Sequence, residues 1–319
     1  MYVEDVQVAD TQLPSACHSP TLCELPDDEL LLVWYAGSFE GASDTVLASA
    51  RRTVAGGWTA PRIVLSLPGL PVGNPVLWRD GDTLTLFFVI VYGSWWTESK
   101  LASMRSYDYG ETWTIPHILR TEPGFMSRAT PLRTRDGALL LPIYDERAWT
   151  PLVLRQEANG AEWELIGDTT ARGKAIQPTL AQLPDGAILM LIRTNQGHIY
   201  KSWSFNAGRS WTASQPTTLP NPNSSIALAS MADGALLLAY NPDERGRERM
   251  ALARSDDNGV TWSPPNILAE GRGEYSYPFM ILSRDGTCIH LVFTVHRTHF
   301  RYISLDAAWL SGMRSALSA

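Results

Sequence analysis

The sequence predicts an all-β fold, a six-bladed β-propeller with four-stranded blades. Two observations carry this prediction: a turn motif that recurs five times, and a series of six hairpin turns in phase with it. A repeat of about 50 residues is typical of propellers, in which each repeat forms one blade. The 12 Trp, 21 Pro and 24 Gly among 319 residues suit a chain of short strands and many turns.

The turn motif has the form Ser-x-Asp/Asn-x-Gly-x-Thr/Ser-Trp. Three full copies span residues 106–113, 204–211 and 255–262, and two shorter relatives at 56–58 and 160–163 keep only the glycine and tryptophan. Neighbouring copies place their tryptophans 48 to 55 residues apart. In such a turn the Asp and Ser side chains bond nearby backbone N–H groups, and Gly supplies a positive φ. The Trp anchors the turn on the sheet.

The hairpin series gives the number of blades. Its turns start at Asp27, Asp80, Asp136, Asp185, Asp233 and Asp285, at steps of 48 to 56 residues. Asp-Gly between two apolar runs is the strongest short hairpin signal. We therefore expect residues 1–319 to form a single propeller domain. The last blade lacks a full set of strands, and residues 1–8 are predicted to supply its outer strand and close the ring.

Composition excludes several functions. The net charge of −7 without a basic run argues against nucleic acid. No apolar run is long enough to span a membrane and the N-terminus has no signal pattern, so we expect a cytoplasmic protein, although a leader removed beforehand would leave the same pattern. Cys17, Cys23 and Cys288 lack metal spacing, and His296 and His299 would face opposite ways on a strand. No metal or other cofactor is expected.

The strand order assigns residues to two rims of the ring. Strand starts and the loops between second and third strands share one rim, here called face A, whereas the turn motifs lie on the other, face B. Propeller pockets lie around the axis, so face A is predicted to carry the site. Polar side chains gather at the innermost strand starts, namely His18, Asn74, Arg128, Gln177, Asn223, Tyr275 and Tyr277. Alternatively, these groups only solvate a water-filled channel.

The loops on face A add charged and aromatic residues. They contribute Glu40, Asp44, Trp96, Tyr144, Glu146, Arg193, His296 and Arg297. Aromatic rings stack on sugars and arginines bind carboxylates in two-pronged fashion, so the combined set suits a small glycan or a terminal sugar as the partner. The sequence leaves the oligomeric state open.

The repeated turn resembles the Asp-box of the sialidase (neuraminidase) superfamily, whose blades carry it between the third and fourth strands. Over its whole length the chain is similar to the divergent branch of BNR-repeat, predicted-neuraminidase proteins. The resemblance implies an acid/base role for Asp44 and a nucleophilic role for Tyr275. His18 stands where the family has a carboxylate-clamping Arg, and Gln177 where it has the Glu that polarises the tyrosine. Gln cannot take a proton, which argues against sialidase activity itself.

Three functions remain open. The first is an exo-acting glycoside hydrolase for a terminal, acidic sugar. Its carboxylate would be bound by Arg128, Arg193 and Arg297, and the acid–base work would fall to Asp44 with Glu40 or Glu146. Asn74, Gln177, Tyr144, Tyr277, His296 and Trp96 would complete the substrate-binding set.

The second function is a lyase acting on a uronic-acid glycan. It needs a base beside a neutralised carboxylate, for which His18, Tyr144, Tyr275 and His296 are candidates. The third is a non-catalytic, glycan-binding or protein-binding propeller. The hydrolase is the reading that we favour.

Two predicted site arginines, Arg128 and Arg297, belong to opposite blades. Like charges facing each other across a channel repel unless an anion lies between them. An acidic sugar could be that anion, or Glu146 or Glu274 could supply the negative charge from within the chain.

Overall fold

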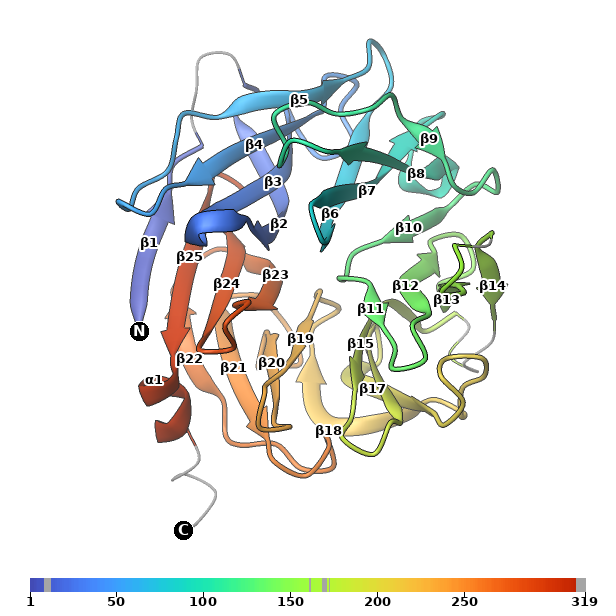
Figure 1. Cartoon of the computed structure of the whole chain (residues 1–319), viewed down its shortest axis with the longest axis vertical. Coiled ribbons are helices and arrows are strands. Elements are labelled where there is room, and N and C mark those ends of the chain that lie inside the picture. The colour runs from blue at the N-terminus through green and yellow to red at the C-terminus, as the bar shows by residue number, and fades with distance from the viewer. Residues whose placement is uncertain (9–12, 161, 168–170, 172, 314–319) are drawn as a thin grey trace.

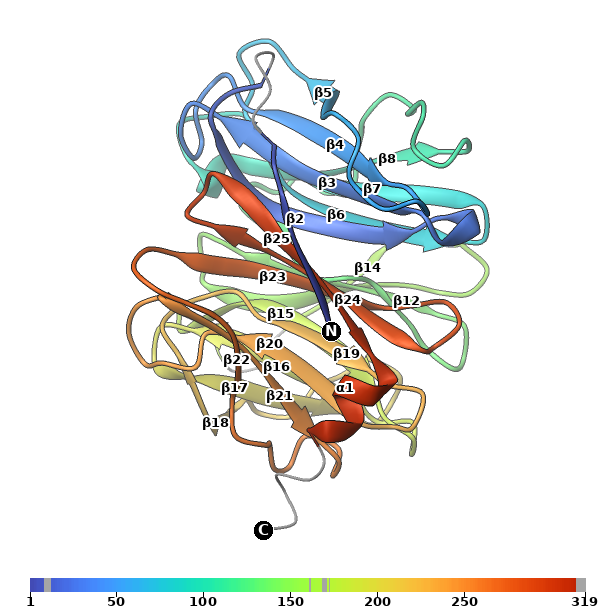
Figure 2. The same cartoon turned by 90° about the vertical axis from the view of Figure 1, so that its left-hand side faces the viewer.

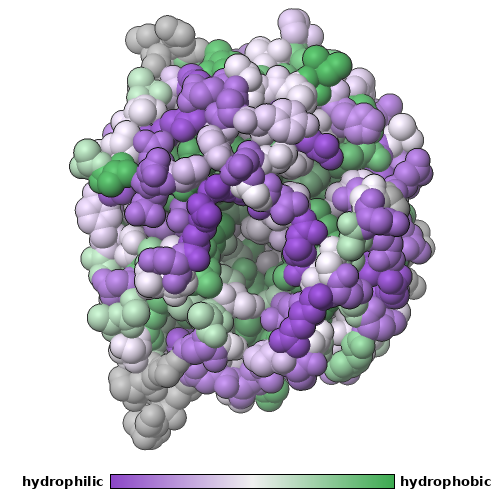
Figure 3. Space-filling view, viewed as in Figure 1, coloured by the Kyte–Doolittle hydropathy of each residue, from purple (hydrophilic) through white to green (hydrophobic). Residues whose placement is uncertain are grey.

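The computed structural model describes residues 1–8, 13–160, 162–167, 171 and 173–313. Six antiparallel sheets stand around a central axis (Figure 1). The predicted all-β, six-bladed propeller is therefore confirmed. Figure 3 shows a hollow at the centre of the ring with a hydrophilic rim.

The first three blades follow the chain from residue 16 to residue 166. Blade 1 contains β2 (Ala16–Glu24), β3 (Leu30–Gly37), β4 (Val46–Arg52) and β5 (Arg62–Ser66). Blade 2 contains β6 (Val72–Asp80), β7 (Thr83–Val91), β8 (Ser99–Ser106) and β9 (His117–Ile118). In blade 3 the first strand is split into β10 (Phe125–Ser127) and β11 (Leu132–Arg133), followed by β12 (Leu139–Asp145), β13 (Thr150–Gln156) and β14 (Glu164–Ile166).

The other three blades complete the circle. Blade 4 contains β15 (Ala175–Gln182), β16 (Ile188–Thr194), β17 (Gly197–Ser204) and β18 (Gln215–Asn221). Blade 5 contains β19 (Ala227–Ser230), β20 (Leu236–Tyr240), β21 (Arg249–Ser255) and β22 (Asn266–Glu270). Blade 6 contains β23 (Tyr275–Leu282), β24 (Cys288–Val295), β25 (His299–Asp306) and β1 (Tyr2–Val6). Short helices are η1 (Pro26–Asp28), η2 (Trp96–Glu98) and α1 (Ala307–Gly312).

The two ends of the described chain meet in blade 6. β1 pairs antiparallel with β25, from Tyr2 opposite Ser304 to Val6 opposite Phe300. Seen from the side, β1 and α1 lie on the outside of this blade (Figure 2). The outer strand of the last blade thus comes from the start of the chain. Within the described residues, no helix is both long and apolar enough to cross a membrane.

The Asp-box turns join third to fourth strands, as expected. Asp108 accepts hydrogen bonds from the Thr112 N–H at 2.8 Å and from the Ser106 hydroxyl at 2.7 Å, while the Ser106 oxygen accepts from the Gly110 N–H at 2.7 Å. Gly110 has φ +88°, and a Cβ there would lie 2.7 Å from a methyl of Leu31 in the preceding blade. The glycine is therefore required both for the turn and for the contact between blades.

The first strands carry a second repeated device. In blades 1, 2, 4 and 6 the pairing of first and second strands slips at a bulge. At each bulge one residue before a proline has a positive φ: Ser19 at 56°, Asn74 at 46°, Gln177 at 53° and Tyr277 at 53°. Bulges re-aim side chains, and such backbone strain gathers at functional sites. Three of these four side chains line the same cavity at the axis, described next.

Candidate functional site

A cavity of about 150 Å³ lies on face A beside the axis. Its polar wall consists of Glu40, Asn74, Tyr144, Glu146, Gln177, Arg193 and Tyr277, and its apolar wall of Trp95, Trp96, Met126, Trp149 and Ile176. These residues lie in the first parts of first strands, at the ends of second strands and in the loops that follow the second strands. A wall of indole rings opposite hydroxyl, amide and charged groups is the lining that a sugar requires.

Tyr144, in β12, is the hydrogen-bonding centre of the cavity. Asn74 donates to its hydroxyl oxygen at 3.0 Å and Gln177 at 3.3 Å. Burial raises the pKa of Tyr144 well above its usual value, so the phenol stays protonated. Because its oxygen accepts two bonds, its own proton remains available to a ligand oxygen.

Arg193, at the end of β16, binds neutral groups. Its Nη1 donates to the Gln177 carbonyl at 2.9 Å and to the Tyr277 hydroxyl at 3.4 Å, and its Nε donates to the Asn223 side-chain oxygen at 2.8 Å. None of these partners, among the residues that the structure describes, carries a negative charge. The carboxyl groups that share the cavity with Arg193 are Glu146 and Glu40, and the charge of Arg193 favours the ionised form of Glu146.

Two glutamates line the same cavity in different surroundings. Burial raises the pKa of Glu146 to about 7, although nearby Arg193 opposes this shift. Glu40 instead forms an ion pair with Arg297. Carboxyl groups whose environments differ in this way can serve as acid and base in one reaction.

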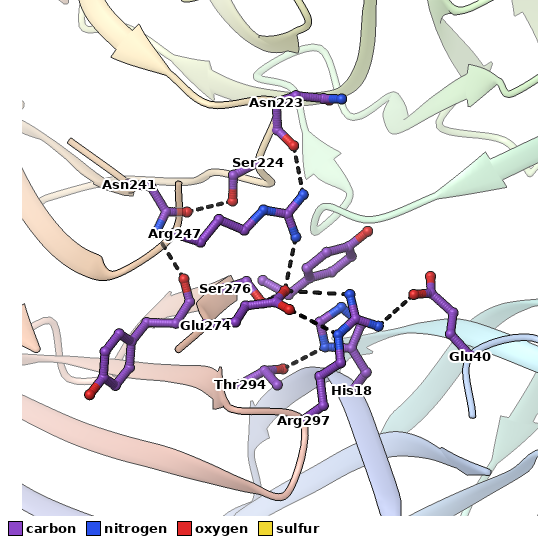
Figure 4. A network of polar contacts seen from close by, with 12 residues as sticks. His18, Glu40, Asn223, Ser224, Asn241, Arg247, Glu274, Ser276, Thr294 and Arg297 are labelled. Carbon is purple, nitrogen blue, oxygen red and sulfur yellow. Dashed lines mark hydrogen bonds and ion pairs between the residues drawn. The ribbon is translucent and has the colours of Figure 1, made fainter. Parts of the chain in front are cut away.

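A third carboxylate, Glu274, lies between two arginines at the edge of the site (Figure 4). It accepts hydrogen bonds from Arg247 Nη1 and Arg297 Nε, both at 2.9 Å, and from the Ser276 hydroxyl at 2.6 Å. Burial raises the pKa of Glu274, but the bonds from Arg297 and Ser276 outweigh it and lower the pKa to about 2. Glu274 is thus ionised under all ordinary conditions.

His18 lies behind the cavity rather than in it. Its ring packs 4.1 Å from the Tyr277 ring, and its Nδ1 lies 3.1 Å from the Thr294 hydroxyl. Burial, together with the charge of Arg297, lowers the pKa of His18 well below its usual value, so the ring is neutral. His18 lines a neighbouring cavity of about 290 Å³, which Glu40 and Arg297 also border.

The structure corrects the expected role of Arg128. Its guanidinium is 3% exposed and donates to the carbonyl oxygens of Tyr277 at 2.9 Å and Pro20 at 3.2 Å. It also lies 5.3 Å from the centre of the Tyr277 ring. Arg128 therefore joins the first strands of three blades beneath the cavity and supports Tyr277, and it is not placed to bind a sugar carboxylate.

Asp44, Tyr275 and His296 were also expected in the site, but they do not line this cavity. The Tyr275 hydroxyl donates to the Glu270 carbonyl at 3.3 Å, in the packing between blades 5 and 6. Asp44 is exposed and accepts from the Ser38 N–H at 3.0 Å. His296 accepts from the Glu274 N–H at 3.1 Å. The tyrosine at the axis is Tyr277, which the bulge turns inward.

Three residues of the site, Met126, Trp149 and Arg247, were missed in the sequence. Trp149 lines the cavity and precedes β13, so the rule that selected Trp96, an aromatic residue in a loop of face A, applies to it as well. Arg247 lies in the equivalent loop of blade 5, between β20 and β21. No group of three or more His, Cys, Asp or Glu within the described ranges could hold a metal ion.

Comparison with known proteins places this geometry in a family context. The model of the BNR repeat-like domain matches residues 28–291. A sialidase of Bacteroides fragilis is 24% identical over 266 residues, which cover 68% of this chain and 47% of the relative. The chain thus spans about half the length of that curated sialidase.

Solved structures share the architecture. The Hadza microbial sialidase Hz136 superposes with a TM-score of 0.81 at 20% identity, covering 96% of this chain and 68% of that one. A leech intramolecular trans-sialidase, solved with 2,7-anhydro-Neu5Ac, gives 0.80 at 15% identity, with coverage of 98% and 71%. At these identities the likeness establishes the fold.

Proposed function

Because the chain belongs to the BNR repeat-like domain family, we propose that it is an exo-acting glycoside hydrolase that removes a terminal sugar from a glycan. The observation that carries the proposal is the pair Glu146 and Glu40 in one cavity. The raised pKa of Glu146, about 7, leaves a large fraction of this carboxyl protonated at neutral pH. Glycoside hydrolysis needs such a protonated carboxyl together with a second, ionised one.

In the proposed reaction Glu146 protonates the oxygen of the leaving group. Glu40, paired with Arg297, is the carboxylate that activates water or attacks the sugar. Tyr144 donates a hydrogen bond to a sugar hydroxyl. Trp95, which is 55% exposed, and Trp149 offer faces on which the ring can stack.

A tyrosine nucleophile, as implied by the resemblance to sialidases, has less support. Among the described residues the Tyr277 hydroxyl bonds Arg193 rather than a carboxylate. Gln177, which cannot take a proton, bonds the same arginine. Tyr277 therefore lacks the base that would activate it, and the chemistry falls to the glutamates.

The lyase reading is also less favoured. The buried Tyr144 phenol holds its proton too tightly to act as a base at neutral pH. Two further candidate bases, Tyr275 and His296, lie outside the lining of the cavity. The acidic sugar expected from the sequence rested on three arginines. Of these, Arg128 is held by backbone carbonyl groups, Arg297 by carboxylates and Arg193 by side-chain amide and hydroxyl oxygens.

Glu146→Gln tests the proposal on a panel of aryl glycosides with good and poor leaving groups. A lost general acid should lower kcat/KM by about 10²- to 10⁴-fold for poor leaving groups and far less for good ones. Glu40→Gln should lower it for both classes. The control is Glu164→Gln, at an exposed position of β14. Losses of equal size for all leaving groups in Glu146→Gln, or no sugar release by the wild type, would refute the assignment.

A further inference from the structure

We infer that Glu274 is a built-in carboxylate that fills an anion site between Arg247 and Arg297, so that the neighbouring cavity takes a neutral sugar. The occupied anion site stands on geometry alone. The step to a neutral substrate rests on the function proposed above.

The contacts of Glu274 are those that a bound carboxylate would make. Its Oε2 accepts from Arg297 Nε at 2.9 Å, and its Oε1 accepts from Arg247 Nη1 at 2.9 Å and from Arg297 Nη2 at 3.4 Å. The Ser276 hydroxyl adds a further donor at 2.6 Å. Two-pronged binding by one guanidinium with support from a second is a complete site for a carboxylate.

Other nitrogens of this arginine pair are engaged as well. The third nitrogen of Arg297, Nη1, is taken by Glu40. The Nη2 of Arg247 donates to the Asn223 carbonyl at 2.7 Å. Two arginines and two glutamates balance, so a sugar carboxylate would have to compete with Glu274 or Glu40 for these guanidinium groups.

The network adjoins the cavity through Glu40 and Asn223. Asn223 bonds Arg247 through its carbonyl and Arg193 through its side chain, and Glu40 lines both face A cavities. The other charged groups of the cavity are Arg193 and Glu146. Arg193 is engaged by three neutral groups, and its charge is opposed by Glu146 wherever that carboxyl is ionised.

Removing the built-in carboxylate should uncover the anion site. We expect acetate or formate, compared with chloride at equal ionic strength, to raise the Tm of Glu274→Ala by several degrees and to leave wild-type Tm unchanged. Glu274→Gln fills the same space without charge and is the matched control, which acetate should not stabilise. The double variant Glu274→Ala, Arg247→Met should lose the response.

Other outcomes overturn the inference. An equal response to acetate in wild type and Glu274→Ala would mean that the arginine pair is not filled. If Glu274→Ala does not fold, refolding with acetate, but not with chloride, must recover it, and failure to do so counts against the site.

A second arm tests the substrate class by binding to the intact wild type. Glucose, N-acetylglucosamine, glucuronate and N-acetylneuraminate are compared by competition at the cavity. A preference for an acid of tenfold or more over its neutral counterpart, abolished in Arg247→Met, would refute the neutral substrate. Both arms measure binding, whereas the proposed function is tested by sugar release. The inference can therefore fail while the proposed function holds, and the proposed function can fail while the inference holds.

Discussion

Replacing Glu146 with Gln should make the protein more stable at alkaline pH while removing its activity. The ordinary pKa of a glutamate, 4.5, is raised to about 7 at this position because the carboxyl is buried. At about 1.36 kcal/mol for each pKa unit, ionising Glu146 in the folded state costs about 3 kcal/mol of the free energy of unfolding.

The direction in which stability changes with pH depends on which state, folded or unfolded, binds the proton of Glu146 more tightly. The folded protein does, since its pKa is the higher one. The contribution of Glu146 is therefore fully present below pH 4.5 and is lost as pH rises to about 7. Gln does not ionise, so the difference in the free energy of unfolding between Glu146→Gln and wild type should grow by about 3 kcal/mol between pH 4.5 and pH 8.

Urea unfolding of both proteins across this pH range measures the difference, and Glu164→Gln should follow the wild-type profile throughout. In the wild type, kcat/KM should fall on the alkaline side with an apparent pKa of about 7, because the general acid must carry its proton. A difference in stability that does not change with pH would show that Glu146 titrates normally, and the assignment of the acid would fail.

Three further predictions concern the scaffold. Gly110→Ala should lower the free energy of unfolding by about 3 kcal/mol, because Gly110 has a φ of +88° and contacts the preceding blade. Gly69→Ala should lower it by about 1 kcal/mol, because Gly69 has a φ of +75° but open space around it. Equal losses in urea unfolding would contradict the contact between blades. Arg128→Met should lower the free energy of unfolding by about 2 kcal/mol, because the carbonyl groups that Arg128 bonds lose their donor. It should also lower kcat more than it raises KM, and unchanged kinetics would show that Arg128 does not position the site. Burial raises the pKa of Cys17 and Cys23 to about 12, so both should resist a disulfide reagent at pH 8 until the protein unfolds, and fast labelling of either in the folded protein would contradict that burial.

The propeller could be predicted because its signals are local and repeated. Each Asp-box turn is fixed by contacts within a few residues, as those of Asp108 with Ser106 and Thr112 show. The turn at Asp27 and Asp28 lacks a glycine, yet both residues take positive φ values of 59° and 58°. Asp tolerates this conformation, so blade 1 has its hairpin turn at the position that the repeat predicts.

Eight of the side chains named from the sequence line the cavity, whereas others, such as Tyr275, do not. Tyr275 and Tyr277 are two apart, and simple alternation places both on one side of a strand. The bulge between Ser276 and Phe279 breaks this alternation and turns only Tyr277 inward. The proline that follows Tyr277 is the local signal that distinguishes the two tyrosines, because the residue before a proline takes the positive φ at each of the four bulges.

Contacts between residues far apart in the sequence also determine the roles of the arginines. The partners of Arg128 include Pro20 and Tyr277, which come from blades 1 and 6 and are far from it in the sequence. The negative charge beside Arg297 was expected from an acidic sugar or from a glutamate of the chain, and the structure shows an ion pair between Glu274 and Arg297. Which carboxylate meets which guanidinium follows from the closed ring, and one sequence does not specify it.

The most direct test of the central claim is to analyse the products from a panel of neutral and acidic glycans, comparing wild type with Glu146→Gln. Reducing-end and ultraviolet detection are read together on each sample. The account predicts release of a single terminal, neutral sugar with one new reducing end, no ultraviolet-absorbing product, and loss of release in Glu146→Gln. An unsaturated, absorbing product would show a lyase instead, and unchanged glycans across the whole panel would show a propeller that binds without catalysis.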